Sequence, residues 1–176
     1  SSLFLDEPTI EAVNRMQIDF NAVGNHEFDR GWRELLRLQN GGCEKFTSRE
    51  PCRISKPFGG AQFGLLAANT LREDGRTLLP ATGLKRFTEG GVTVTMGFIG
   101  LTLKATPTTV SPAGVVGLRF EDEAATANAL VPQLRAQGDV FQHRHFGNHL
   151  DVLEGAAHAA LGNLARGPTA DHAAPE

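Results

Sequence analysis

The segment Gly24-Asn25-His26-Glu27-Phe28-Asp29 places an amide, an imidazole and two carboxylates within six residues. An Asn side-chain oxygen is a neutral, hard ligand that can complete a metal site built mainly from Asp and His. His26 can donate to a phosphate oxygen if its other ring nitrogen is held, and Asp29 can reach back to hold it. The spacing therefore suits a positioned general acid or transition-state donor. A helix-capping turn with a surface histidine explains the same residues equally well.

The elements that must position this segment are those of an α/β protein. An apolar run over residues 18–23 predicts a buried strand that stops at Gly24, and open α/β folds place their active sites at the carboxyl ends of such strands. Apolar residues at helical spacing predict a helix over 7–16 and a second helix over 31–39, capped by Asp29. The second helix has its expected buried side at Trp32, Leu35, Leu36 and Leu38.

Later segments continue the alternation of strands and helices. The sequence predicts a loop over 41–61, a strand over 63–68, a hairpin across Gly90-Gly91, a loop over 104–117 and a helix over 121–137. After residue 138 the pattern ends, because residues 139–176 hold five of the six histidines and eight alanines but no convincing strand. We interpret this tail as an out-of-frame reading of a GC-rich gene, with a disordered or divergent C-terminus as the alternative.

Composition narrows the class of protein. A chain of 176 residues and 18.9 kDa suits one domain or a large piece of one, and 40% hydrophobic with 21% charged residues excludes a collagen-like or disordered polymer. The balance of 17 Lys and Arg against 20 Asp and Glu argues against a surface for a nucleic-acid polymer. The apolar runs are far shorter than the ~20 residues that a membrane span needs.

Cys43 and Cys52 are nine positions apart in the predicted 41–61 loop. Such a pair can close a disulfide in an oxidising compartment, and two free thiols in a cytosolic protein fit the composition equally well. A zinc half-site fits less well, because the spacing is long and no histidine lies close in the sequence.

Segments along residues 3–138 resemble one known family. They are Asp6-Glu7-Pro8-Thr9-Ile10-Glu11-Ala12, Asp19-Phe20-Asn21-Ala22-Val23 with the Gly24 to Asp29 segment, Phe58-Gly59-Gly60-Ala61-Gln62-Phe63, Leu66-Ala67-Ala68-Asn69-Thr70, Gly97-Phe98-Ile99-Gly100-Leu101-Thr102 and Leu130-Val131-Pro132-Gln133-Leu134-Arg135. Together they resemble the 5′-nucleotidase branch of the calcineurin-like metallophosphoesterases, which includes the bacterial 2′,3′-cyclic-nucleotide 2′-phosphodiesterases.

The resemblance implies a four-layer α/β/β/α sandwich with two divalent metal ions (Mn, Zn, Mg, Ca or Fe) that activate water and clamp the phosphate. By motif position, Asn25 would ligate one metal, His26 would stabilise the transition state or leaving group, and Asp29 would orient His26. Glu27 would be a surface or capping carboxylate. The resemblance further implies a nucleotide substrate, a periplasmic or secreted protein and, in the exported protein, a Cys43–Cys52 disulfide.

The chain also departs from the family pattern. The Asp-x-His motif of the first strand, the Gly-Asp segment with the bridging aspartate, the strand histidine after Gly138 and the final Gly-His-x-His motif are all missing. His143, His145 and His149 lie in a context that matches neither histidine motif. We therefore expect residues 1–138 to form a partial sandwich without its first strands and its last ligand-bearing strands, and 139–176 to form a divergent tail.

Three readings of the function follow. The first, favoured by the non-Met start and the unusual tail, is a fragment of a periplasmic nucleotidase that is inactive alone. The second is a half-site completed by another chain that supplies the missing ligands. The third is a non-catalytic binding or surface module that keeps the α/β scaffold.

Overall fold

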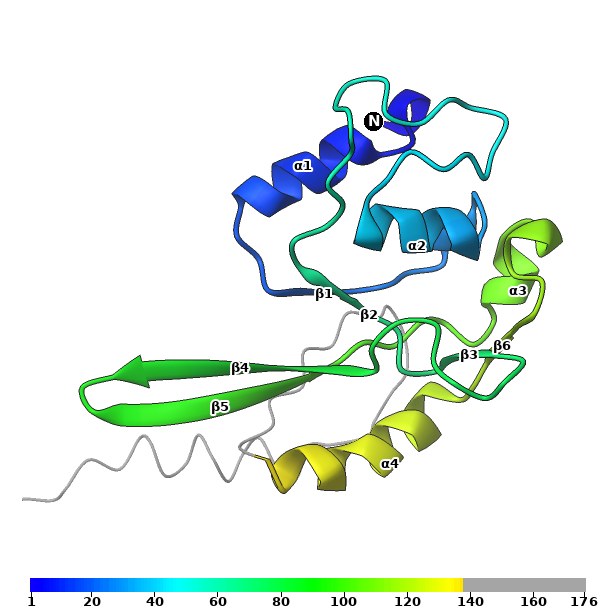
Figure 1. Ribbon diagram of the computed structural model, residues 1–176. Helices are drawn as coiled ribbons and strands as arrows, with labels where there is room; N and C mark the ends of the chain where they lie inside the picture. The colour runs from blue at the N-terminus through cyan, green and yellow to red at the C-terminus, as the bar shows by residue number, and fades with distance from the viewer. Residues whose placement is uncertain (138–176) are drawn as a thin grey trace, which may run out of the picture. The chain divides into compact units, whose positions relative to one another are not determined.

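The computed structural model describes residues 1–137, and the predicted tail over 139–176 lies outside the described residues (Figure 1). The longer elements are α1 (Glu7–Arg15), α2 (Trp32–Asn40), β4 (Thr82–Glu89), β5 (Val92–Ile99) and α4 (Glu123–Arg135). The shorter ones are β1 (Phe20–Ala22), β2 (Gly64–Leu66), β3 (Thr70–Arg72), α3 (Thr106–Thr109) and β6 (Leu118–Phe120), with 3-10 turns η1 (Ser2–Phe4), η2 (His26–Phe28) and η3 (Pro112–Gly114).

The strands of residues 1–137 pair two by two. β1 and β2 are parallel, whereas β3 pairs with β6 and β4 pairs with β5 in antiparallel ladders. The β4–β5 ladder runs from Thr82 opposite Ile99 to Glu89 opposite Val92. This mixture of helices with small parallel and antiparallel sheets confirms the predicted α/β class and a partial sandwich.

The predicted hairpin is confirmed because its turn chemistry is unambiguous. Gly90 and Gly91 both have positive φ, 56° and 79°, which a two-residue turn between twisted strands requires and which glycine adopts without strain. The predicted 104–117 loop is wrong in part, since it contains α3 and η3. The short strands β3 and β6 were not predicted, because three residues each are too few for a periodic pattern.

The predicted cap of α2 is also wrong. Gly31 is the N-cap residue, with φ of 88°, and no side chain caps the helix. The Asp29 carboxylate instead lies 2.9 Å from Nδ1 of His26. Asp29 makes this contact within its own turn. The N-cap position lies directly before Trp32, the first residue of α2, and Asp29 is two residues too early in the chain to occupy it.

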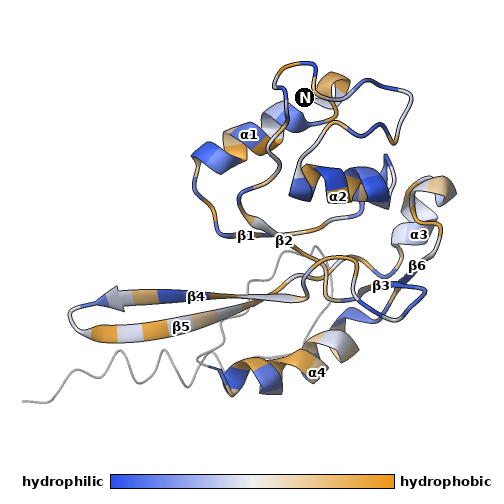
Figure 2. Cartoon of the chain, viewed as in Figure 1, coloured by the Kyte–Doolittle hydropathy of each residue, from blue (hydrophilic) through white to orange (hydrophobic). Residues whose placement is uncertain are grey.

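The core gathers around the ends of β1 and β2. Its buried members come from both halves of residues 1–137: Val23, Phe28, Leu35, Phe63, Leu65, Ala67, Leu78, Leu79, Val115 and Phe120. The rings of Phe28 and Phe120 meet edge to face with centroids 5.3 Å apart. Helices α1 and α2 mix apolar and hydrophilic residues along their length (Figure 2), and their apolar residues Ile10, Val13, Trp32 and Leu36 pack against this core.

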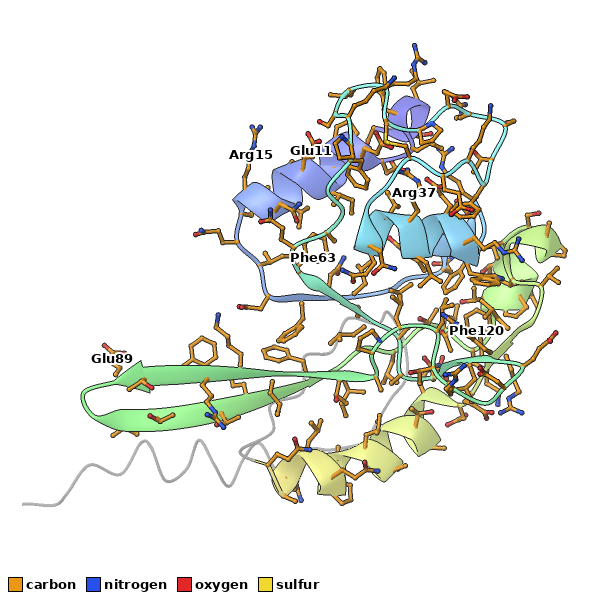
Figure 3. All side chains as sticks on the ribbon, in the orientation of Figure 1. Glu11, Arg15, Arg37, Phe63, Glu89 and Phe120 are labelled. Atoms are coloured by element: carbon orange, nitrogen blue, oxygen red, sulfur yellow. A yellow bond between two sulfur atoms is a disulfide. The ribbon has the colours of Figure 1, made fainter. Side chains whose placement is uncertain are left out.

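Helix α2 also buries two charged residues that its apolar spacing did not predict. Arg37, labelled on α2 in Figure 3, donates to Glu34 at 2.6 Å and to Glu7 of α1 at 2.8 Å. These three side chains are only 1–2% exposed. The Arg37 guanidinium also lies 5.2 Å from the Phe58 ring. Burial lowers the pKa of Arg37, but the hydrogen bonds and charges of Glu34 and Glu7 outweigh it and leave that pKa raised. We call these three residues the buried charge cluster.

The 41–61 loop attaches to the buried charge cluster at two points. The Gly42 carbonyl accepts from Arg37 at 2.9 Å, and the Cys52 backbone N–H donates to Glu7 at 2.9 Å. A disulfide joins Cys43 to Cys52, so it links the two stretches of loop that hold the cluster.

Removing this disulfide should therefore lower stability. In the chain-entropy account, closing so short a loop contributes about 2–3 kcal/mol to the free energy of unfolding. We expect a Cys43→Ala/Cys52→Ala chain to unfold at correspondingly lower urea concentration than the oxidised chain. Non-reducing mass spectrometry of the oxidised chain should find the cross-linked peptide, and two alkylatable thiols would contradict the prediction.

Candidate functional site

The polar segment leaves the carboxyl end of β1, but the predicted buried strand over 18–23 is wrong in part, because β1 covers only Phe20–Ala22 and most of the run before Val23 is exposed. Val23 follows β1 and is buried, Gly24 ends the run, and Asn25 precedes the turn η2. Phe28 anchors this turn because its side chain is fully buried in the core. Gly114 permits the close approach of η3, since a Cβ on it would lie 2.2 Å from the Phe28 carbonyl oxygen. The anchor fixes the turn while its polar side chains stay at the surface.

The turn brings His26 and Asp29 together. Nδ1 of His26 lies 2.9 Å from a carboxylate oxygen of Asp29, and the two side chains are 77% and 51% exposed. A carboxylate only accepts, so the contact requires the proton on Nδ1. Nε2 then accepts in the neutral ring and donates in the imidazolium. The pair can thus present one oriented N–H to an anionic group.

Asn25 is oriented by a residue that the sequence did not single out. Its Nδ2 donates to the hydroxyl of Thr109, at the end of α3, over 3.4 Å. Within residues 1–137, no hydrogen bond to Oδ1 of Asn25 is formed, so this oxygen can serve as a ligand. Glu27 points back toward Gly24: a Cβ there would lie 3.0 Å from Glu27 Oε2. Among the described residues, Glu27 makes no side-chain hydrogen bond to His26 or Asp29.

Comparison with curated proteins finds relatives of several kinds, although no family model matches the chain. The chain is 58% identical over 94 residues to an uncharacterised protein of the pqq-V 5′ region of Acinetobacter calcoaceticus, covering 52% of this chain and 45% of that protein. It is 37% identical to endonuclease YhcR of Bacillus subtilis, covering 78% and 10%. It is 30% identical to the cell wall protein Lmo0130 of Listeria monocytogenes, covering 78% and 17%. The chain spans less than half the length of each of these relatives.

Solved structures share the fold. The calcineurin-like phosphoesterase YfkN of Bacillus subtilis matches with a TM-score of 0.60 at 20% identity, over 84% of this chain and 42% of that chain. A Staphylococcus aureus protein assigned as a 5′-nucleotidase matches with a TM-score of 0.57 at 26% identity, over 91% and 29%. The fold is that of a partial calcineurin-like metallophosphoesterase domain.

Calcineurin-like phosphoesterases use divalent metals, and each such ion needs several protein ligands held in fixed positions. Within residues 1–137, no three His, Cys, Asp or Glu side chains lie close enough together to hold a metal ion. One neutral amide oxygen cannot hold a divalent ion against water. The described residues therefore do not fit a two-metal site by themselves. His143, His145 and His149 lie outside the described residues.

Two further observations bear on the domain. None of the helices described over residues 1–137 combines the length and the apolar character needed to cross a membrane. Two buried polar residues were not identified as site residues from the sequence: Thr102, which bonds to Val23 just after β1, and Asn69, which bonds to Thr102. Only their contacts in three dimensions connect them with the polar segment.

Proposed function

We propose that this chain is part of a metal-dependent phosphoesterase that hydrolyses nucleotide phosphomonoesters or cyclic phosphodiesters, and that the chain alone is inactive. The His26–Asp29 pair at the end of β1, with Nδ1 and carboxylate 2.9 Å apart, carries the proposal. A metallophosphoesterase fold supports it, as do relatives whose names, endonuclease and 5′-nucleotidase, denote cleavage of nucleotide phosphoester bonds.

In this proposal each residue of the polar segment has a separate task. Asp29 holds the Nδ1 proton and the ring orientation of His26. His26 donates from Nε2 to a phosphate oxygen or leaving group, where negative charge develops. Asn25 would offer Oδ1 to one of two divalent ions, and the other ligands of these ions would have to come from outside the described residues. Thr109 keeps the Asn25 amide turned so that Oδ1 is the free atom.

We also propose that the protein acts outside the cytoplasm, in the periplasm or as a secreted protein. The Cys43–Cys52 disulfide supports this, because such bonds persist in oxidising compartments. The likeness to a cell wall protein points the same way.

A substrate panel tests the proposal in the full-length protein that contains this segment. We expect release of phosphate or opening of the cyclic ester from at least one of 5′-AMP, 3′-AMP and 2′,3′-cyclic AMP in Mn²⁺, and loss of this activity in EDTA. The absence of hydrolysis of all three with Mn²⁺, Zn²⁺ or Mg²⁺ would contradict the proposal and favour a non-catalytic module.

A further inference from the structure

We propose that Asn69 and Thr102 are positioning residues that fix the backbone from which Asn25 and His26 project. The catalytic part of this inference rests on the proposed function. Both side chains are fully buried, at 0% exposure. Asn69 lies between β2 and β3, and Thr102 follows β5, so each is far in the chain from the segment that it holds.

Thr102 acts directly on the residue before Gly24. Its hydroxyl donates to the carbonyl of Val23 at 2.8 Å. The N–H of Val23 donates to the Leu66 carbonyl at 3.0 Å, in line with the β1–β2 pairing. Both backbone polar groups of Val23 are therefore satisfied inside the protein. Since Val23 is the last buried residue before the polar segment, these bonds determine where the segment begins.

Asn69 in turn fixes Thr102. Its Oδ1 accepts from the Thr102 N–H at 2.8 Å, and its Nδ2 donates to the Thr102 carbonyl at 2.6 Å. The same Nδ2 donates to the Glu121 carbonyl at 2.9 Å, just before α4. The side-chain amide of Asn69 thus bonds both backbone polar groups of Thr102 and also the backbone just before α4. Thr102 cannot move from Val23 unless Asn69 moves as well.

Close backbone packing near Gly100 brings Asn69 and Thr102 within hydrogen-bond distance. A Cβ on Gly100 would lie 2.3 Å from atoms of Leu66, so only glycine lets the end of β5 lie this close to β2. The Ala68 N–H donates to the Gly100 carbonyl at 2.6 Å across the same contact. Thr102 follows two residues after Gly100 and therefore lies close to the end of β1.

The neighbouring Thr70 shows that burial of a threonine does not by itself produce such a bond. Thr70 is also fully buried, yet its hydroxyl has no hydrogen-bond partner among residues 1–137. A valine has nearly the same shape as a threonine, so packing alone does not require a hydroxyl at position 102. A satisfied buried polar network contributes modest net stability but specifies one geometry. The directed bond to Val23 is what distinguishes Thr102.

The experiment compares amide hydrogen exchange in the 176-residue chain and three variants. Thr102→Val removes the donor and leaves the Val23 carbonyl buried without a partner, so we expect exchange of the Val23 amide, which donates to Leu66, to become about 5- to 150-fold faster. Thr102→Ser keeps the hydroxyl and should restore slow exchange of that amide. Thr70→Val is the matched control and should leave exchange at Val23 unchanged. Exchange of the α2 amides should be no faster in Thr102→Val than in Thr70→Val.

Several results would overturn the inference. They are unchanged exchange of the Val23 amide in Thr102→Val, equal acceleration throughout the chain, or failure of Thr102→Ser to restore slow exchange at Val23. If Thr102→Val does not fold, the unmodified chain decides: a slowly exchanging Thr102 hydroxyl proton observed by NMR supports the inference, and its absence contradicts it. These readouts need no enzymatic activity, so they stand even if the proposed function fails.

A kinetic readout in the full-length protein tests the catalytic part. Thr102→Val should lower kcat with little change in KM, because it disturbs the placement of His26 rather than general binding of the substrate. Thr102→Ser should restore kcat. A rise in KM alone, with kcat unchanged, would contradict a positioning role.

Discussion

Replacing His26 with alanine in the full-length protein is expected to lower kcat for phosphoester hydrolysis by about 10²–10³, the usual cost of removing one preorganised donor. The physical reason is the 2.9 Å contact with Asp29, which orients the ring before the substrate arrives. The side chain of His26 is 77% exposed, so its loss should leave folding intact and the effect should be one of chemistry. Steady-state kinetics with bis-p-nitrophenyl phosphate in saturating Mn²⁺ would measure it.

Two variants sharpen this prediction. Glu27→Gln changes the adjacent charge without touching the His26–Asp29 pair, so kcat should stay near normal. Asp29→Asn keeps a side-chain oxygen that can accept from Nδ1 but loses the second, equivalent carboxylate oxygen, so the ring is held less well and kcat should fall by less than in His26→Ala. Near-normal turnover of His26→Ala would show that the pair has no catalytic role.

The second large effect is expected in the buried charge cluster. Arg37→Met should lower the free energy of unfolding by about 3–5 kcal/mol, because it leaves Glu7 and Glu34 buried without their cationic partner. The side chains of the cluster are only 1–2% exposed, so water cannot replace the lost partner. Urea unfolding of the 176-residue chain, followed by circular dichroism, would measure the change.

A surface ion pair provides the matched control for Arg37→Met. Arg76 contacts Asp74 at 2.6 Å, but its side chain is 81% exposed. Arg76→Met removes the same chemical group and should leave the urea midpoint almost unchanged, because solvent screens exposed pairs. If the two variants had equal midpoints, the cluster would contribute no more than an ordinary surface pair, and the prediction would be wrong.

Local patterns in the sequence predicted most of the longer elements. Apolar spacing predicted the helices, and Gly90-Gly91 predicted the hairpin, because in both cases the signal lies within a few residues of the element that it forms. The contact between His26 and Asp29 was predictable for the same reason, since it spans three residues of one turn.

The features that sequence reasoning missed depend on long-range contacts. Arg37 and Glu34 both lie on the buried side of α2, and the approach of Glu7, 30 residues before Arg37, supplies the second buried carboxylate that pairs with the guanidinium. The bond between Asn25 and Thr109 spans 84 residues, and that between Thr102 and Val23 spans 79. No local pattern marks such partners, because the fold alone brings them together.

The most direct test of the account compares phosphodiester hydrolysis by the full-length protein and by the 176-residue chain under the same conditions. Both would be assayed with bis-p-nitrophenyl phosphate and 2′,3′-cyclic AMP in Mn²⁺, each with its His26→Ala variant. We predict metal-dependent turnover by the full-length protein that requires His26, and none by the chain alone, because its described residues cannot hold two metal ions. Turnover by the chain that depends on both Mn²⁺ and His26, or a full-length protein without metal-dependent activity, would contradict the account.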